Sequence, residues 1–177
     1  MIHQNFKLKN RDQIKEVLKK INVDQHQLVE KGYSSYSTLL DYEKFGVFNK
    51  IIEKFLKLAG KNFNIVDFWI NIYFKNGHVK KHNHITSIKK LEKVPLKTGV
   101  YYFEKPRNSG NIVLDNRLIK VRQEDMIIFE GKSMHYSEKN ISVFPRIIFS
   151  VNMMKGVQKT WNEKLQQYNL EITKNEL

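Results

Sequence analysis

The chain has 177 residues, a formal net charge of +13, six histidines and no cysteine. This length suits one domain with a full core, and a hydrophobic content of 41% excludes a disordered chain despite the charge. The lack of cysteine excludes disulfides, thiolate metal sites, iron–sulfur clusters and cysteine nucleophiles, so a bound metal would need histidine or carboxylate ligands.

The excess of lysine favours anionic partners, among them nucleic acid or a polyanionic small molecule. Because the lysines are spread along the chain without a block of like charges, most of them are expected to form a solvated surface. The sequence has no apolar run of about 18 residues and no evident signal peptide. These two absences predict a cytoplasmic protein without a membrane span.

Residues 1–60 have the apolar periodicity of helices. Apolar residues recur at helical spacing within 14–21, and Asn10 is a candidate N-terminal cap. The same spacing over 48–58 predicts a second, stronger helix, and Gly60 stands where a C-terminal cap would be. This part is therefore expected to supply helices that cover one face of a sheet.

Residues 61–155 change to a pattern of short strands separated by turn residues. Such a pattern favours a mainly β sandwich or jelly roll within a single domain spanning 1–177. Residues 156–177 form a C-terminal extension, in which Trp161, Leu165 and Tyr168 have the spacing of a short amphipathic helix. The predicted strands cover 64–74, 99–103, 111–114, 118–121, 126–129 and 146–153.

Three histidines of the β part have a spacing that suits a metal site. His82 and His84 are two residues apart, and on an extended backbone residues i and i+2 point to the same side. His135 follows a later strand, and antiparallel packing in a jelly roll can bring that strand beside the first pair. Three imidazoles would leave open positions on the metal, as in a catalytic rather than a closed structural site. His78 is expected to be a loop residue outside this set.

Arg146 opens the last predicted strand and shares one face of it with Ile148, Ser150 and Asn152. A guanidinium that points into a sandwich interior is costly unless an anion meets it. Arginine also binds a carboxylate through two parallel hydrogen bonds. An inward Arg146 near the histidines therefore predicts an anionic cosubstrate that also ligates the metal. The alternative is an arginine that reaches solvent or pairs with a local acid such as Glu138.

The order of the motifs between Trp69 and Asn152 resembles a known family, the iron(II)/2-oxoglutarate-dependent oxygenases. The resemblance is strongest to short bacterial and phage proteins related to prolyl hydroxylases, and it covers about half of the chain. The motifs that carry it are Trp69-Ile70-Asn71, Gly77, His82-Asn83-His84, Thr98-Gly99-Val100-Tyr101-Tyr102, Pro106, Ser109-Gly110, Glu124-Asp125-Met126-Ile127-Ile128-Phe129, His135 and Arg146.

This resemblance implies a double-stranded β-helix with N-terminal helices packed on one sheet. It implies that His82, His84 and His135 are the catalytic metal ligands and hold Fe(II). Arg146 would bind the distal carboxylate of 2-oxoglutarate, with Tyr102 and Ser150 as further contacts. The reaction would be a hydroxylation that uses O2 and couples 2-oxoglutarate decarboxylation to the oxidation of a prime substrate, which the sequence does not identify.

The sequence departs from the family pattern at several positions. Most relatives have Asp or Glu where His84 stands, and a third neutral imidazole would leave the iron more positive. Ile148 stands where Ser or Thr is common, and Ser150 follows two residues later. The segment 85–97 is longer than expected and carries four lysines, which predicts either a solvated loop or a lid over an anionic prime substrate.

Two other functions fit parts of the sequence. A cupin-like metal protein that does not use 2-oxoglutarate would add Glu92, which is separated from Gly99 by six residues, to the histidine ligands. A basic β-sandwich that binds nucleic acid would stack bases on the aromatic residues that lie among the lysines. The aromatic residues of that second alternative are Tyr73, Phe74, Tyr101 and Tyr102.

Overall fold

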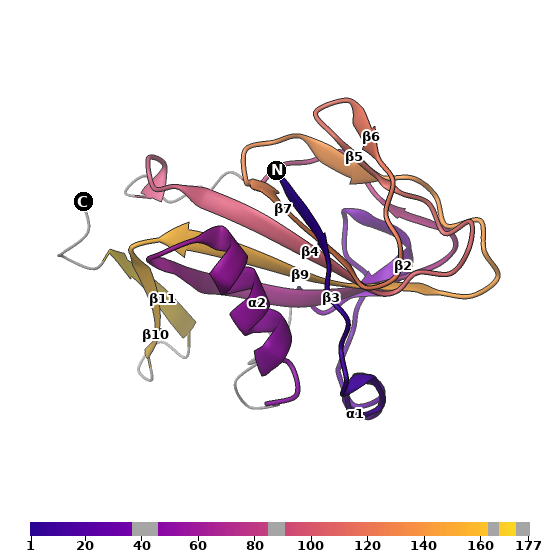
Figure 1. Ribbon diagram of the computed structural model, residues 1–177, viewed down its shortest axis with the longest axis horizontal. Coiled ribbons are helices and arrows are strands. Elements are labelled where there is room, and N and C mark those ends of the chain that lie inside the picture. The colour runs from indigo at the N-terminus through magenta and orange to yellow at the C-terminus, as the bar shows by residue number, and fades with distance from the viewer. Residues whose placement is uncertain (37–45, 85–90, 163–166, 173–177) are drawn as a thin grey trace.

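The computed structural model describes residues 1–36, 46–84, 91–162 and 167–172, which form a large and a small antiparallel sheet, a separate two-stranded C-terminal hairpin, and helices on one side of the large sheet (Figure 1). The large sheet consists, in spatial order, of β1 (Ile2–Asn5), β7 (Asp125–Glu130), β4 (Leu96–Glu104), β9 (Arg146–Lys155), β3 (Phe63–Val79) and β2 (Val29–Ser34). The small sheet consists of β6 (Arg117–Ile119), β5 (Ile112–Leu114) and β8 (His135–Ser137).

The predicted strands of the central region are all present, and the mainly β class is confirmed. β3 is the longest strand, with 17 residues, and its β-branched and aromatic sequence pairs with β9 from Phe63 to Tyr73. The turn between β5 and β6 is formed by Asp115 and Asn116, which both have positive φ angles. The turn residues thus set the register of this hairpin.

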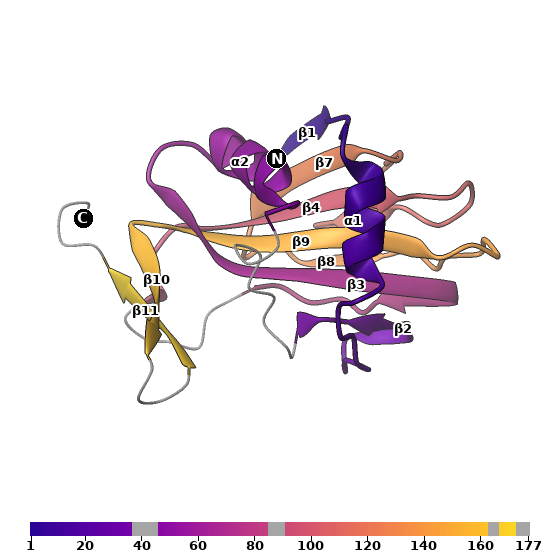
Figure 2. The same ribbon diagram turned by 90° about the horizontal axis from the view of Figure 1, so that it is seen from below.

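Both predicted helices are present, as α1 (Arg11–Leu18) and α2 (Asn49–Ala59). They lie on the same side of the large sheet (Figure 2). α2 ends at Gly60, whose φ of 105° is readily adopted only by glycine. Within the described residues, neither helix is long and apolar enough to cross a membrane. The side chains that α2 buries are Ile51, Ile52, Phe55 and Ala59.

Gly99 of β4 allows α2 to approach the sheet closely. A Cβ atom at this position would lie 2.4 Å from Cε1 of Phe55, so a side chain here would displace the helix. After Gly99, successive side chains of β4 point to opposite faces of the sheet. Tyr101 packs in the cluster under the helices, whereas Val100 and Tyr102 pack in the cluster between the sheets.

Strands also occur where only helices were predicted. β1 pairs with β7 and β2 pairs with β3, so residues 1–60 supply both edges of the large sheet. Their polar sequences have no clean period-two pattern, and the neighbouring strand defines them. The Asn10 cap is also wrong in detail, because its side chain donates to the carbonyl of Val47 at 2.9 Å and caps no helix N–H.

The C-terminal extension forms a hairpin instead of the expected helix. β10 (Val157–Asn162) pairs with β11 (Gln167–Ile172) in register from Val157 opposite Ile172. Strand pairing thus overrides the weak helical spacing around Trp161. Leu165, the central residue of that predicted helix, lies outside the described residues.

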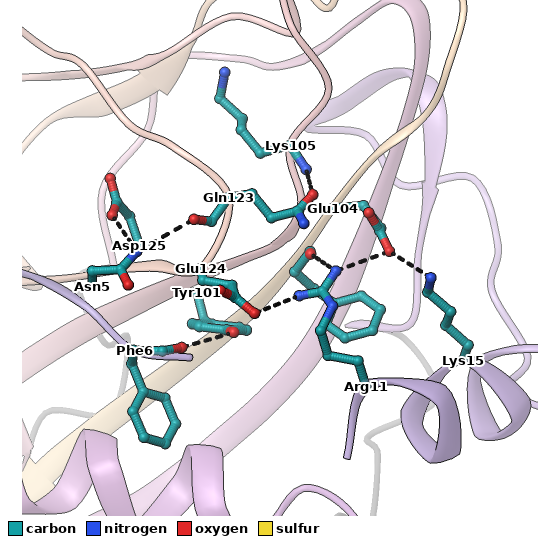
Figure 3. Close-up of polar contacts among 11 residues, drawn as sticks. Asn5, Phe6, Arg11, Lys15, Tyr101, Glu104, Lys105, Gln123, Glu124 and Asp125 are labelled. Atoms are coloured by element: carbon teal, nitrogen blue, oxygen red, sulfur yellow. Dashed lines mark hydrogen bonds and ion pairs between the residues drawn. The ribbon is translucent and has the colours of Figure 1, made fainter. Parts of the chain in front are cut away.

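The N-terminal segment is held against the large sheet by a polar network around Arg11 (Figure 3). Its Nη2 donates to the carbonyl of Phe103 at 2.7 Å and to Oε1 of Glu104 at 3.0 Å. Its Nη1 donates to Oε1 of Glu124 at 3.3 Å, and the guanidinium lies 4.5 Å from the centroid of the Phe103 ring. One largely buried side chain thus links α1 to the ends of β4 and β7.

Replacing Arg11 with alanine should lower the free energy of unfolding by about 2 kcal/mol, because charge-assisted hydrogen bonds to a backbone carbonyl and two carboxylates are lost. Lys15 is a matched control, since its ammonium contacts the same Glu104 carboxylate but its side chain is half exposed. Urea denaturation of both alanine variants measures the difference. An Arg11 variant that unfolds at the wild-type urea concentration would contradict this account.

Candidate metal centre

Three histidines converge at one end of the space between the two sheets. His82, His84 and His135 each offer a ring nitrogen, and these nitrogens all lie within 4.8 Å of one another. The backbone sets this arrangement, because His82 and His135 exchange two hydrogen bonds of 2.9 and 2.8 Å across an isolated antiparallel bridge. The backbone N–H of His84 donates to the carbonyl of Gly131 at 2.8 Å, and this bond fixes the backbone position of the third histidine.

Backbone carbonyls orient two of the three rings. Nδ1 of His82 lies 2.7 Å from the carbonyl oxygen of Lys80, and Nδ1 of His135 lies 3.1 Å from that of Ser133. A neutral imidazole that donates from Nδ1 to a carbonyl keeps the lone pair of Nε2 available for a metal. Nδ1 of His84 lies 3.4 Å from the amide nitrogen of Asn152.

Burial keeps the three imidazoles neutral. Burial, together with the neighbouring His135 and His82, lowers the pKa of His84 to about 3. It also lowers the pKa of His135 to about 4, with His82 contributing, and lowers the pKa of His82. At neutral pH the three rings are therefore unprotonated, and each can offer a nitrogen lone pair to a cation.

A cavity of about 450 Å³ adjoins the histidine cluster. Its walls are the inward-facing residues of β3, β4 and β9, which alternate with residues that pack under the helices. Tyr102 and Ser150, the predicted cosubstrate contacts, both line it and are only 3% exposed. The polar lining of these three strands consists of Asp67, Trp69, Asn71, Tyr73, Thr98, Tyr102, Ser150 and Asn152.

Arg146 is buried behind this cavity, with 1% of its surface exposed. Its Nη1 donates to the carbonyls of Ser109 at 2.5 Å and Glu138 at 3.2 Å, and its Nη2 donates to Oγ of Ser137 at 2.7 Å. Its Nε has no hydrogen-bond partner in the described chain. The carboxylate of Glu138 accepts from Asn111 instead, and no ion pair between Glu138 and the guanidinium forms within the described chain.

The hydroxyl of Tyr73 is a second buried polar group without a partner in the described chain. The guanidinium carbon of Arg146 lies 4.4 Å from the centroid of the Tyr73 ring. Burial raises the pKa of Tyr73 to about 12 and raises the pKa of Tyr102, so both phenols are neutral donors. A buried cation, an orphaned N–H and phenol donors together fit an anion, since each unpaired group costs stability when no ligand meets it.

One residue of this site, Asp67, was not singled out from the sequence, and three others were named there without a role in this cavity. Asp67, Asn71 and Tyr73 line the cavity, and Asn152 links two of the walls through hydrogen bonds to Thr98 at 3.0 Å and Asp67 at 3.1 Å. Period-two alternation outward from Trp69 would have found the three on β3, because they lie on the same face of that strand.

The structure separates some residues that the alternatives brought together. Glu92, the carboxylate of the cupin-like alternative, is exposed and lies outside the histidine cluster. Tyr73, Tyr101 and Tyr102 are core residues, which leaves only Phe74 as an exposed ring of the proposed base-stacking set. Residues 85–90, which hold two lysines of the predicted basic loop, lie outside the described part of the chain.

No protein-family model matches this sequence, and a comparison with curated proteins finds no match. Solved structures do resemble it. HygX from Streptomyces hygroscopicus, with nickel and 2-oxoglutarate bound, is 8% identical over 87% of this chain and 82% of its own, with a TM-score of 0.66. A prolyl-4-hydroxylase from Pseudomonas putida is 11% identical over 87% of this chain and 91% of its own, with a TM-score of 0.62.

The viral collagen prolyl hydroxylase of Paramecium bursaria Chlorella virus-1, in complex with 2-oxoglutarate, is 16% identical. That match covers 88% of this chain and 97% of the viral protein, with a TM-score of 0.59. At these identities the likeness is one of fold, and it confirms the predicted fold class. The large and small sheets of this chain form the double-stranded β-helix, or jelly roll, that these solved structures share.

Proposed function

We propose that this protein is an Fe(II)/2-oxoglutarate-dependent oxygenase, and specifically a hydroxylase. The observation that carries the proposal is a cavity that joins the cluster of His82, His84 and His135 to the walls around a buried Arg146. The histidines would bind a metal at one side of this cavity. The region around Arg146 would bind the far end of a dicarboxylate that also ligates the metal. The solved structures of HygX and the viral hydroxylase, which hold 2-oxoglutarate in the same fold, support this reading.

The donor set fits iron. Three neutral imidazoles are suitable ligands for Fe(II), and leaving half of an octahedral shell open suits a metal that must also take a chelating cosubstrate and O2. The set lacks the carboxylate of the common two-histidine, one-carboxylate arrangement. A site of three neutral ligands keeps the full charge of the metal, which strengthens its attraction for a dianionic cosubstrate.

The surroundings of Arg146 fit a carboxylate. The free Nε of Arg146 and the free hydroxyl of Tyr73 are buried donors of the kind that bind an anionic oxygen strongly. Tyr102 and Ser150 add two more hydroxyls on the same cavity wall. These groups would hold the distal carboxylate of 2-oxoglutarate and orient its keto acid end toward the histidines.

When bound, iron and 2-oxoglutarate together supply the oxidising chemistry that turns a C–H bond into C–OH. The chain's own residues position the reactants and exclude water. Trp69 and Val100 close the cavity with apolar surface, and the neutral histidines contribute no proton that would compete with the metal. The prime substrate would enter the part of the cavity that lies away from Arg146.

The test is an anaerobic titration of the metal-free protein with Fe(II) and then 2-oxoglutarate, followed by visible absorption. A keto acid chelated to iron gives a weak charge-transfer band, which we expect with 2-oxoglutarate and not with succinate, a dicarboxylate that lacks the keto group. On admission of air, succinate should form from 2-oxoglutarate. Iron binding without the band would favour the cupin-like function, and an absence of iron binding would overturn both.

A further inference from the structure

We infer that the prime substrate carries a cationic nitrogen, held between the carboxylate of Asp67 and the rings of Tyr36 and Trp69. The inference rests on the proposed function only in assigning this ligand the role of prime substrate. The lining of the cavity supports the binding site by itself. The inference extends the proposed function by naming a class of substrate.

The cavity is larger than a cosubstrate of five carbons requires. Its volume of about 450 Å³ is within the range of pockets that enclose drug-sized ligands. The walls beyond the histidines, away from Arg146, are mostly apolar. They are formed by Val66, Leu96, Met154 and Leu170.

Asp67 is the only acidic side chain among the described residues that line the cavity, and no lysine or arginine accompanies it there. A register shift between Ile65 and Asp67, where β3 pairs with β9, places Val66 and Asp67 both on the cavity wall. Bulges of this kind re-aim side chains beside functional sites. The amide of Asn152 donates to Oδ2 of Asp67 at 3.1 Å, and no ion pair neutralises the carboxylate within the described chain.

Aromatic rings connect Asp67 with the metal centre. The ring centroids of Tyr36 and Trp69 are 5.2 Å apart in an edge-to-face contact, and those of Trp69 and His84 are 5.6 Å apart. Tyr36 is 39% exposed, so its ring lies at the solvent side of this wall. Burial and the negative charge of Asp67 both raise the pKa of Tyr36, as expected for a carboxylate close to the phenol.

A carboxylate beside aromatic faces is suited to an ammonium or methylated ammonium group. Rings attract a cation through their quadrupoles, by about 0.5 to 2 kcal/mol, and the carboxylate adds a direct charge interaction in a partly desolvated site. A neutral group of the same shape would receive only the apolar contacts. Asp67 makes this part of the cavity negative, whereas the whole chain carries a formal net charge of +13. A cation held here would lie beside His84 and hence beside the metal centre.

The experiment compares choline with its neutral isostere, 3,3-dimethylbutan-1-ol, by ligand-observed NMR titration of the metal-free full chain. Choline should bind at least about tenfold more tightly, equivalent to about 1.4 kcal/mol. The isosteric Asp67→Asn variant should lose this preference, since the amide keeps an acceptor for Asn152 but removes the charge. Glu53→Gln removes an exposed carboxylate from α2 and is the matched control, which should retain the preference.

A Tyr36→Leu variant provides a second test, because the exposed position of its ring allows replacement without a buried cavity. It should weaken choline binding severalfold more than binding of the alcohol. Equal affinities for the two probes, or a preference that survives Asp67→Asn, would overturn the inference. Because the titration uses no iron and no 2-oxoglutarate, it is independent of the charge-transfer experiment, and either proposal can fail without the other.

Discussion

Replacement of His135 by alanine is expected to weaken Fe(II) binding by at least about a hundredfold, because even outer-shell partners of a metal site change its affinity 10- to 100-fold. His135 is 4% exposed, its ring packs against Phe129, and its backbone exchanges two hydrogen bonds with His82. The backbone bonds survive the substitution. The variant should therefore keep its fold and lose only a ligand.

Isothermal titration under argon measures the affinity, and circular dichroism checks the fold. His78→Ala is the matched control, since His78 lies at the end of β3, shortly before His82 in the chain, but its Nε2 lies 3.7 Å from Oε2 of Glu30 and the residue is not in the cluster. It should bind iron as the wild-type protein does. If His135→Ala kept the wild-type affinity, the convergence of the three rings would be a feature of packing and not a metal site.

The three histidines differ in how far the local sequence predicts their positions. His82 and His84 are close in sequence, and strand alternation alone places them on one side. The position of His135 depends on a β-bridge that spans 53 residues, from 82 to 135, and the jelly-roll topology was needed to expect it. A local pattern thus defined two ligands, and the third was indicated by the expected jelly-roll packing together with the ordered motifs of the resemblance.

The helices and central strands were predictable because their signals are strong and local. α2 has an apolar face and a glycine stop, and β3, β4 and β9 are rich in β-branched and aromatic residues. The strands β1, β2, β10 and β11 were not predicted. The edge strands β1 and β2 are mainly polar, and all four are defined by hydrogen bonds to a partner rather than by their own composition.

The segment from Ile65 to Asp67 illustrates a limit of period-two reasoning. Regular alternation along β3 assigns Ile65 and Asp67 to the same face, but Ile65 packs in the cluster under the helices while Asp67 lines the cavity. The register shift between them separates the two faces, and nothing in the local sequence indicates it. The bulge thus places the neighbouring Val66 and Asp67 on the same cavity wall, an arrangement that regular alternation does not predict.

Replacement of Arg146 by glutamine is expected to raise the dissociation constant for 2-oxoglutarate roughly 100-fold, since removing one partner of a buried charge pair costs about 2 to 5 kcal/mol. The affinity for Fe(II) should not change, because Arg146 is not in the histidine cluster. The charge-transfer band at increasing 2-oxoglutarate concentration measures the first quantity, and isothermal titration with Fe(II) under argon measures the second. The band should return at high cosubstrate concentration, with its wild-type position.

Two comparisons separate cosubstrate binding from a purely structural role of Arg146. Arg107→Gln removes an exposed arginine and should leave both affinities unchanged. Arg146→Lys keeps the charge but loses the planar fork that matches a carboxylate, so it should recover only part of the affinity. If Arg146 served only to bind the carbonyls of Ser109 and Glu138, both Arg146 variants would lower the melting temperature while 2-oxoglutarate bound as before. That result would remove the cosubstrate from the proposal and leave the histidine cluster as a metal site of another kind.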